Sequence, residues 1–116
     1  MNYRRGDIVL VLFPDSNLLT SKRRPALVVQ ADRLDTGLPQ TIVAMITSNM
    51  AGAGRPSRVV VRVDAKRTNA SGLLMDSVIT TDNLATVRES EIDRVIGALQ
   101  EMDEIDSALR ATLGLG

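Results

Sequence analysis

The sequence predicts an α+β fold that is mostly β, a small curled sheet or barrel completed by an amphipathic helix at the C-terminus. Short apolar runs rich in β-branched residues occupy the first two thirds of the chain, and a helical period of apolar residues appears only after position 101. With 116 residues, 44% hydrophobic content and no linker-like stretch, the chain has room for one core. Residues 1–116 are therefore expected to form a single domain.

Five strands are expected from the periodicity of the first two thirds. The first is apolar on both faces and ends at Pro14, because proline cannot continue a central ladder. The second and third are short apolar runs, and the fourth carries arginines among its valines, as a half-exposed edge strand does. The expected strands cover residues 7–13, 25–31, 41–47, 58–63 and 77–81.

The C-terminal part combines a turn, a short strand and a helix. Ser90 to Asp93 is typical of a capping box that opens a helical turn, and residues 95–99 are expected to form a last strand, interrupted by Gly97. From Glu101 on, acidic residues crowd the first turn of a helix that stops at Gly114. Its core-facing positions are Met102, Ile105, Ala108, Leu109, Thr112 and Leu113.

Cysteine and histidine are both absent, which removes several classes of chemistry. Without cysteine the chain has no disulfide, thiolate metal site or thiol nucleophile, and without histidine it lacks the commonest general base and zinc ligand. We therefore expect neither a metal nor a cofactor. No apolar run approaches the length that spans a membrane, so a cytoplasmic location and no membrane partner are the default expectations.

The formal net charge is zero, but the charges are unevenly distributed along the chain. Residues 1–75 hold eleven Lys or Arg against five Asp, and residues 76–116 hold three Arg against nine acids. A basic half can bind a polyanion, while an acidic half keeps the protein soluble or binds a basic partner. The alternative is that folding intermixes the two halves and leaves no basic patch.

Two strands carry polar groups at ends that would meet in an antiparallel pair. Arg24 stands at the entrance of the second strand, before Pro25, and Thr47 and Ser48 stand at the exit of the third. An arginine fork matches phosphate oxygens, and hydroxyls donate short hydrogen bonds beside it. Proline also biases the preceding residue toward extended geometry. The pattern predicts a phosphate-sized site.

Four sequence blocks make the chain resemble the MazF/PemK family of toxin endoribonucleases. They are RGDIVLV at 5–11, RPALVV at 24–29, ITS at 46–48 and GLLMDSVI at 72–79, and a helical tail follows them. The resemblance implies an SH3-like barrel of the CcdB/PemK type, a homodimer, and a toxin that an acidic, partly disordered antitoxin neutralises. It also implies cleavage of single-stranded mRNA, by attack of a ribose 2′-hydroxyl that leaves a 2′,3′-cyclic phosphate.

The resemblance also assigns roles to individual residues. Arg24 and Thr47 fall on the family's catalytic positions, and Asp82 falls where some relatives carry a functional aspartate, so it is a candidate acid or base. The residues expected to contact RNA around them are Lys22, Arg23, Ser48, Asn49, Arg55 and Arg58. Each has a plainer interpretation as a surface or turn residue, including an Arg24 that simply pairs with Asp7 or Asp82.

One departure from the family pattern lies in the loop before the second strand. Many relatives place a glutamate there, where this chain has Leu19. The departure bears on the cleaved sequence and on the acid-base assignment, and it leaves the phosphate site intact. Two other functions stay open at this point: a CcdB-type gyrase inhibitor, and a non-catalytic binding protein on the same barrel.

Overall fold

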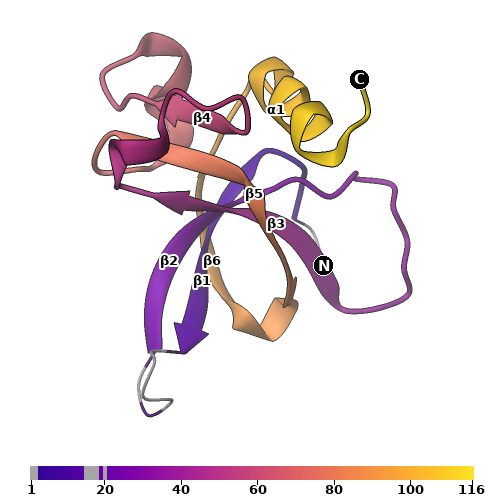
Figure 1. The fold of residues 1–116 in the computed structure, drawn as a ribbon. Coiled ribbons are helices and arrows are strands. Elements are labelled where there is room, and N and C mark those ends of the chain that lie inside the picture. Colours follow the sequence, from indigo (N-terminus) through magenta and orange to yellow (C-terminus); the bar gives the residue numbers. More distant parts are fainter. Residues whose placement is uncertain (1–2, 15–18, 20) are drawn as a thin grey trace.

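A computed structural model describes residues 3–14, 19 and 21–116 of the chain. Its described part contains one antiparallel sheet with the strand order β4-β5-β3-β2-β1-β6, and one α-helix (Figure 1). The strands are β1 (Asp7–Pro14), β2 (Ser21–Val28), β3 (Gln40–Thr47), β4 (Arg58–Val61), β5 (Ser77–Arg88) and β6 (Ile92–Ala98). The helices are η1 (Met50–Gly52), η2 (Lys66–Ser71), η3 (Glu89–Glu91) and α1 (Asp103–Leu113), of which the three η segments are 3₁₀ turns.

All five expected strands are present; β1, β3 and β4 differ from the expected limits by one or two residues, and β2 and β5 differ by more. Strand β2 begins at Ser21 and ends at Val28, so its arginines lie within the strand and not before it. Strand β5 runs on to Arg88, and its expected end at position 81 is wrong. The cause is a bulge: Met45 of β3 pairs with Thr80, but Ala44 pairs with Leu84, and the polar residues between interrupt the apolar pattern.

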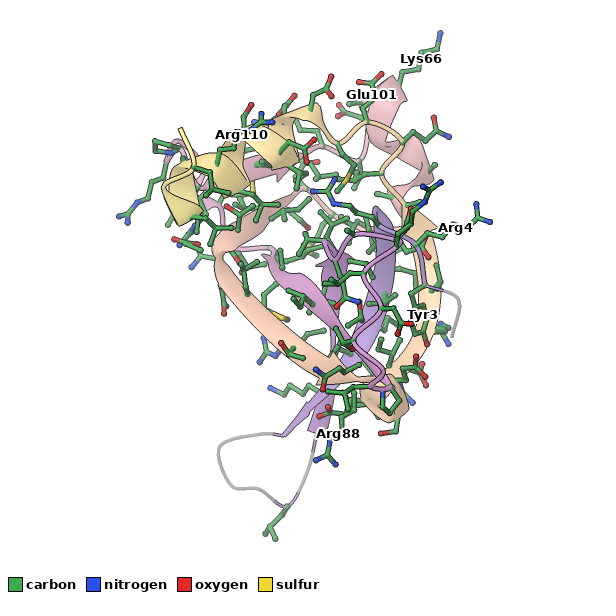
Figure 2. The ribbon with its side chains drawn as sticks, turned by 90° about the vertical axis from the view of Figure 1, so that its right-hand side faces the viewer. Tyr3, Arg4, Lys66, Arg88, Glu101 and Arg110 are labelled. Atoms are coloured by element: carbon green, nitrogen blue, oxygen red, sulfur yellow. The ribbon has the colours of Figure 1, made fainter. Side chains whose placement is uncertain are left out.

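The turn expected at 90–93 is misplaced by a few residues. The 3₁₀ turn is η3, and the N–H of Arg88 donates a 2.8 Å hydrogen bond to the Glu91 carboxylate. Strand β6 therefore starts at Ile92, before the predicted position. The C-terminal helix is confirmed, and Gly114 ends it with a left-handed φ of 69°. Figure 2 shows Arg110 on α1 and Arg88 at opposite ends of the molecule.

Apolar residues lie on both sides of the sheet, as the sequence of β1 predicts. Ile8 contributes to one buried cluster, and its neighbours Val9 and Val11 contribute to another; all three are fully buried. Successive side chains of a strand point to opposite faces, which accounts for this alternation. Helix α1 covers the first cluster with Ile105 and Ala108, and in Figure 1 it lies beside β4, far from the end of β1 and the start of β2.

Two polar contacts fasten α1 to the sheet. Arg5 donates 2.7 Å to Asp106 and 2.9 Å to the carbonyl of Val29, and the hydroxyls of Thr81 and Thr112 share a 2.9 Å hydrogen bond. The mostly β fold with a C-terminal helix is thereby confirmed. The closed SH3-like barrel stays a prediction, because β4 and β6 are the two edges of the strand order. Among the described residues, no helix is both long and apolar enough to cross a membrane.

Candidate active site at the β2–β3 edge

The candidate site lies where the ladder between β2 and β3 stops. The last pair is Ala26 with Met45, although both strands continue beyond it. Val29 donates its N–H to Ile42 of β3, and N–H directions alternate along a strand, so the backbone nitrogen of Pro25 also faces β3. Proline has no N–H to donate. The next pair of the ladder therefore lacks one of its bonds, and the strands are free to part.

Arg24 and Thr47 lie on the two sides of this opening. Each is two residues beyond the last ladder pair, so in the register of the pair they stand opposite each other. Their outer sides are anchored: Arg24 pairs with Val11 of β1, and Thr47 pairs with Val78 of β5. The sequence prediction that the cation and the hydroxyl meet at one sheet edge is consistent with this register.

A cleft of about 500 Å³ occupies the opening, and both Arg24 and Thr47 line it. Its charged lining residues are three arginines, Arg23, Arg24 and Arg94, with no carboxylate among the residues that line it. The other lining residues are Leu10, Pro25, Ile46, Ser48, Gly72, Leu73, Leu74, Met75, Ser77 and Ile96. The lining thus combines cationic and apolar side chains, a combination that suits a nucleotide phosphate and its base.

The apolar wall depends on a close contact at Gly72. This residue has a φ of 76°, and a Cβ built on it would lie 2.0 Å from the carbonyl oxygen of Ile96. Only glycine combines that backbone conformation with that approach. Gly72 therefore lets the segment that carries Leu73, Leu74 and Met75 lie against β6, where it forms one side of the cleft.

The three arginines differ in how they are held. Arg24 is exposed, and no hydrogen bond or ion pair joins it to a residue within the described part of the chain. Arg23 pairs with Asp93 at 3.2 Å, and Arg94 approaches the same carboxylate oxygen at 3.8 Å. Asp93 neutralises one of these three charges, so the cleft keeps a net positive charge that can bind an anion. Arg24 is the arginine whose guanidinium is not engaged by Asp93.

Thr47 is connected to the loop that follows it. Its hydroxyl oxygen accepts a 3.1 Å hydrogen bond from the N–H of Asn49, and the Asn49 side chain accepts 3.0 Å from the N–H of Ala51 to cap η1. In these contacts Thr47 acts as an acceptor only, so its proton can be donated to a phosphate oxygen. Ser48 is exposed at the rim of the same cleft.

Asp82 is held away from the cleft by a fork of hydrogen bonds. Arg58 donates to its two carboxylate oxygens at 3.0 and 3.2 Å, and Ser57 donates at 3.2 Å. The hydrogen bond from Arg58 lowers the pKa of Asp82 below its ordinary value. A carboxylate with a lowered pKa is a weak base, and this one does not line the cleft.

A second, shallower groove shares Thr47 with the cleft. Its volume is about 260 Å³, and its lining residues are Thr47, Asn49, Ala51, Gly52, Arg55 and Arg58. Arg55 is exposed there and has no ion pair within the described ranges, whereas Arg58 is engaged by Asp82. Lys22 is exposed on β2 opposite Phe13, outside both grooves. Of the 15–22 loop, residues 15–18 and 20 lie outside the described residues, and Leu19 is 87% exposed.

Folding intermixes the basic and acidic halves of the sequence in part. Four ion pairs each join a basic residue of the first half to an acid of the second: Arg5–Asp106, Arg23–Asp93, Arg58–Asp82 and Arg62–Asp76. The alternative without a basic patch therefore holds over much of the surface. The cleft is an exception, because Arg24 lies in it with no carboxylate among the lining residues.

Sequence reasoning missed Arg94 and the apolar segment 73–75. Arg94 stands opposite Leu10 of β1, and Leu10 stands opposite Pro25 of β2, so the three residues form one row across the sheet. That row exists only because β6 pairs with β1, and the local sequence around position 94 carries no signal of it. The GLLMDSVI block was noted for its resemblance, but its place in the cleft was not predicted.

Comparisons with known proteins identify the family of the chain. Residues 4–113 match the family model described as PemK-like, MazF-like toxin of type II toxin-antitoxin system. The chain is 32% identical over 114 residues to the probable endoribonuclease MazF of Mycolicibacterium smegmatis, covering 97% of each chain. It is 34% identical over 118 residues to the endoribonuclease EndoA of Bacillus subtilis, covering 99% of this chain and 97% of the relative.

Solved structures show the same fold. The Mycobacterium tuberculosis toxin MazF-mt6 has a TM-score of 0.66 at 25% identity, covering 94% of this chain and 93% of that one. A mycobacterial endoribonuclease in complex with its cognate antitoxin has a TM-score of 0.75 at 19% identity, covering 99% and 98%. At that identity, the second likeness concerns the fold alone. Together with the family match over residues 4–113, these relatives show that the chain belongs to the PemK-like, MazF-like toxins of type II toxin–antitoxin systems.

Proposed function

We propose that this protein is the toxin of a type II pair and acts as a metal-independent endoribonuclease on single-stranded RNA. The observation that carries the proposal is the juxtaposition of Arg24 and Thr47 in one cationic cleft at the open end of the β2–β3 ladder. The full-length relatives named endoribonucleases support it. The absence of histidine and cysteine from the sequence favours a mechanism based on electrostatic stabilisation over metal or imidazole chemistry.

In the proposed reaction, a ribose 2′-hydroxyl attacks the adjacent phosphorus and the bond to the 5′-oxygen breaks. The products are a 2′,3′-cyclic phosphate and a 5′-hydroxyl; the 2′-oxygen loses a proton and the 5′-oxygen gains one. Negative charge grows on the phosphoryl oxygens, where the guanidinium of Arg24 and the hydroxyl of Thr47 donate hydrogen bonds. Arg24 stays protonated, so its role is charge stabilisation and not proton abstraction.

The proposed RNA path runs from the cleft across Thr47 into the second groove. Arg23 and Ser48 line the first part of this path, and Asn49 and Arg55 line the second. Lys22 extends the cationic side beyond the cleft. The chain has only two aromatic residues, Tyr3 and Phe13, so bases would pack on aliphatic side chains and on arginine, and not on a row of aromatic rings.

The test is cleavage of matched single-stranded and double-stranded RNA by the purified protein, with analysis of the product ends. We expect cleavage of the single strand, with 2′,3′-cyclic phosphate and 5′-hydroxyl ends. Thr47→Ala should abolish cleavage, and Thr47→Ser should retain most of it, because serine keeps the hydroxyl. Wild-type protein that binds RNA without cutting it would identify a non-catalytic family member instead, and equal activity of Thr47→Ala would remove Thr47 from the mechanism.

We further propose that the protein is a homodimer, and that its antitoxin neutralises it with an extended acidic segment laid over the cationic side of the cleft. The charge of Arg23, Arg24 and Arg55 would attract such a segment, and its binding would exclude RNA. Hydrogen exchange with and without the antitoxin peptide tests this. Protection is expected in residues 21–24 and 49–57, and protection confined to α1 would show that inhibition is indirect.

A further inference from the structure

Asp82, the candidate acid or base, lies outside the cleft, yet it is connected to it through two other residues. The first connection is its fork to Arg58, with donor–acceptor distances of 3.0 and 3.2 Å. Arg58 begins β4, Asp82 lies in the bulge of β5, and the side chain of Arg58 is only 22% exposed. A bidentate pair of this kind fixes the orientation of a guanidinium more firmly than a single bond does.

The second connection is the contact between Arg58 and Gly52. A Cβ built on Gly52 would lie 2.3 Å from Nη1 of Arg58 and 3.2 Å from its Cζ. The guanidinium therefore lies directly against the backbone of η1, and a side chain at position 52 would displace it. The loop is closed around this contact by the N–H of Arg55, which donates to the carbonyl of Gly52 at 3.3 Å, and by the N–H of Arg58, which donates to Arg55 at 3.0 Å.

The loop that rests on Arg58 is also the loop that orients Thr47. The N–H of Asn49 donates to the Thr47 hydroxyl oxygen, and the Asn49 side chain caps η1 through Ala51. The order of contacts is therefore Asp82, Arg58, Gly52, η1, Asn49 and Thr47. A change at the first member can alter the rotamer of the last without touching RNA.

We infer that Asp82 and Arg58 are positioning residues: together they fix the 49–55 loop, and through it the Thr47 hydroxyl, in the geometry that cleavage requires. This inference rests on the proposed function. It differs from the sequence expectations, in which Asp82 was a candidate acid or base and Arg58 a contact to RNA. In the positioning role, neither side chain touches the scissile phosphate, and the charge of Arg58 is neutralised by Asp82 within the protein.

The chain offers a closely matched pair of variants for the test. In Gly52→Ala the new methyl group is expected to displace the Arg58 guanidinium, the same group that forms the fork with Asp82. Gly54→Ala adds the same methyl group to the same loop, where nothing lies within 4 Å of the built Cβ. Asp82→Asn weakens the fork from its other side. If both perturbations act through one contact, the double variant Gly52→Ala/Asp82→Asn should be little worse than either single variant.

The first readout is independent of activity. Three-bond couplings to Cγ2 report the side-chain rotamer of Thr47 by NMR in the full-length protein. We expect a single rotamer in wild type and Gly54→Ala, and averaged rotamers with faster amide exchange at Asn49 and Ala51 in Gly52→Ala and Asp82→Asn. Thermal unfolding of each variant shows that the fold persists.

The second readout is single-turnover cleavage of a single-stranded RNA. Misplacement of a reacting group by about 1 Å can cost on the order of a hundredfold, so we expect losses of about tenfold to a hundredfold in Gly52→Ala and Asp82→Asn. The rates are compared at saturating protein, because Gly52 and Arg58 also line the second groove and their change can alter RNA affinity there. Gly54→Ala should cleave like wild type. Wild-type rates and Thr47 couplings in both variants would overturn the inference and leave the proposed function standing. Absence of cleavage by the wild type would overturn the proposed function first, and with it any role of Asp82 in cleavage.

Discussion

Replacement of Arg24 by alanine is the most direct test of the cleft. The side chain is exposed and lacks a partner in the described part of the chain, so its removal should change the free energy of unfolding by no more than about 0.5 kcal/mol. Loss of one preorganised donor to a developing oxyanion costs roughly a hundredfold to a thousandfold in rate, or about 2.7 to 4 kcal/mol. Activity and stability should therefore separate clearly in this variant.

A second arginine provides the matched control. Arg33 is also exposed, and it lines neither groove, so Arg33→Ala removes the same side chain and the same charge from another part of the surface. Any general electrostatic loss of RNA affinity is then common to both variants. Arg24→Lys separates charge from geometry, because lysine keeps the charge but lacks the planar fork; it should recover only part of the lost rate.

The assay is single-turnover cleavage of a single-stranded oligonucleotide at saturating protein, with urea unfolding measured in parallel. The reasoning requires Arg24→Ala to be slower than Arg33→Ala by at least about a hundredfold while the unfolding curves coincide. If the two variants cleave at similar rates, Arg24 supplies only general attraction. If Arg24→Ala unfolds at a lower urea concentration than Arg33→Ala, the Arg24 side chain has a structural role that its exposure does not show.

Three further results are expected. Cleavage should persist in excess chelator, since the chain lacks histidine and cysteine and no carboxylate of the described residues lines the cleft to bind magnesium; a loss that magnesium restores would overturn the metal-independent mechanism. Arg55→Ala should reduce the salt dependence of RNA binding by a slope of about 0.7, the value for one phosphate contact on a single strand, and an unchanged slope would remove Arg55 from the RNA path. Arg58 lowers the pKa of Asp82 below its ordinary value of 3.8. The stabilisation of the fold by this ion pair should therefore be complete above that pH and disappear as the pH falls through the lowered pKa. In thermal unfolding, the melting temperature of the wild type should exceed that of Asp82→Asn by a constant amount near neutral pH and by less in acid. A difference that persists in strong acid would contradict this.

Much of the fold could be predicted from the sequence because it depends on local signals. The periodicity of β1 and β3, the stop at Gly114 and the acidic first turn of α1 each lie within a few residues of what they determine. The expected meeting of Arg24 and Thr47 needed only one further assumption, the antiparallel pairing of two consecutive strands. The extension of β5 was missed because its bulge breaks the apolar pattern.

The remaining parts of the site depend on contacts that no local pattern encodes. Arg94 reaches the cleft because the last strand pairs with the first, and the segment 73–75 reaches it because Gly72 fits against Ile96. The fork between Arg58 and Asp82 joins an edge strand to a bulge that was not predicted. Each is a product of tertiary arrangement, and a single sequence without that arrangement gives only the types of residue involved.

The proline at the end of the β2–β3 ladder leaves the proposed catalytic residues on the two strands, apart from the loop side chains that would contact the rest of the RNA. The proposed catalytic residues, Arg24 and Thr47, stand on strands that β1 and β5 hold from their outer sides, and the gap between these strands begins at the Pro25 nitrogen, which has no hydrogen to donate. The segment at 49–57 joins β3 to β4 without contributing a ladder pair of its own. Its exposed positions, such as Arg55, can exchange side chains while the contacts of Asn49 and Gly52 that orient Thr47 stay in place. Under the proposed function, new RNA targets can therefore arise by substitution at the exposed positions of this loop, with Arg24 and Thr47 left in place.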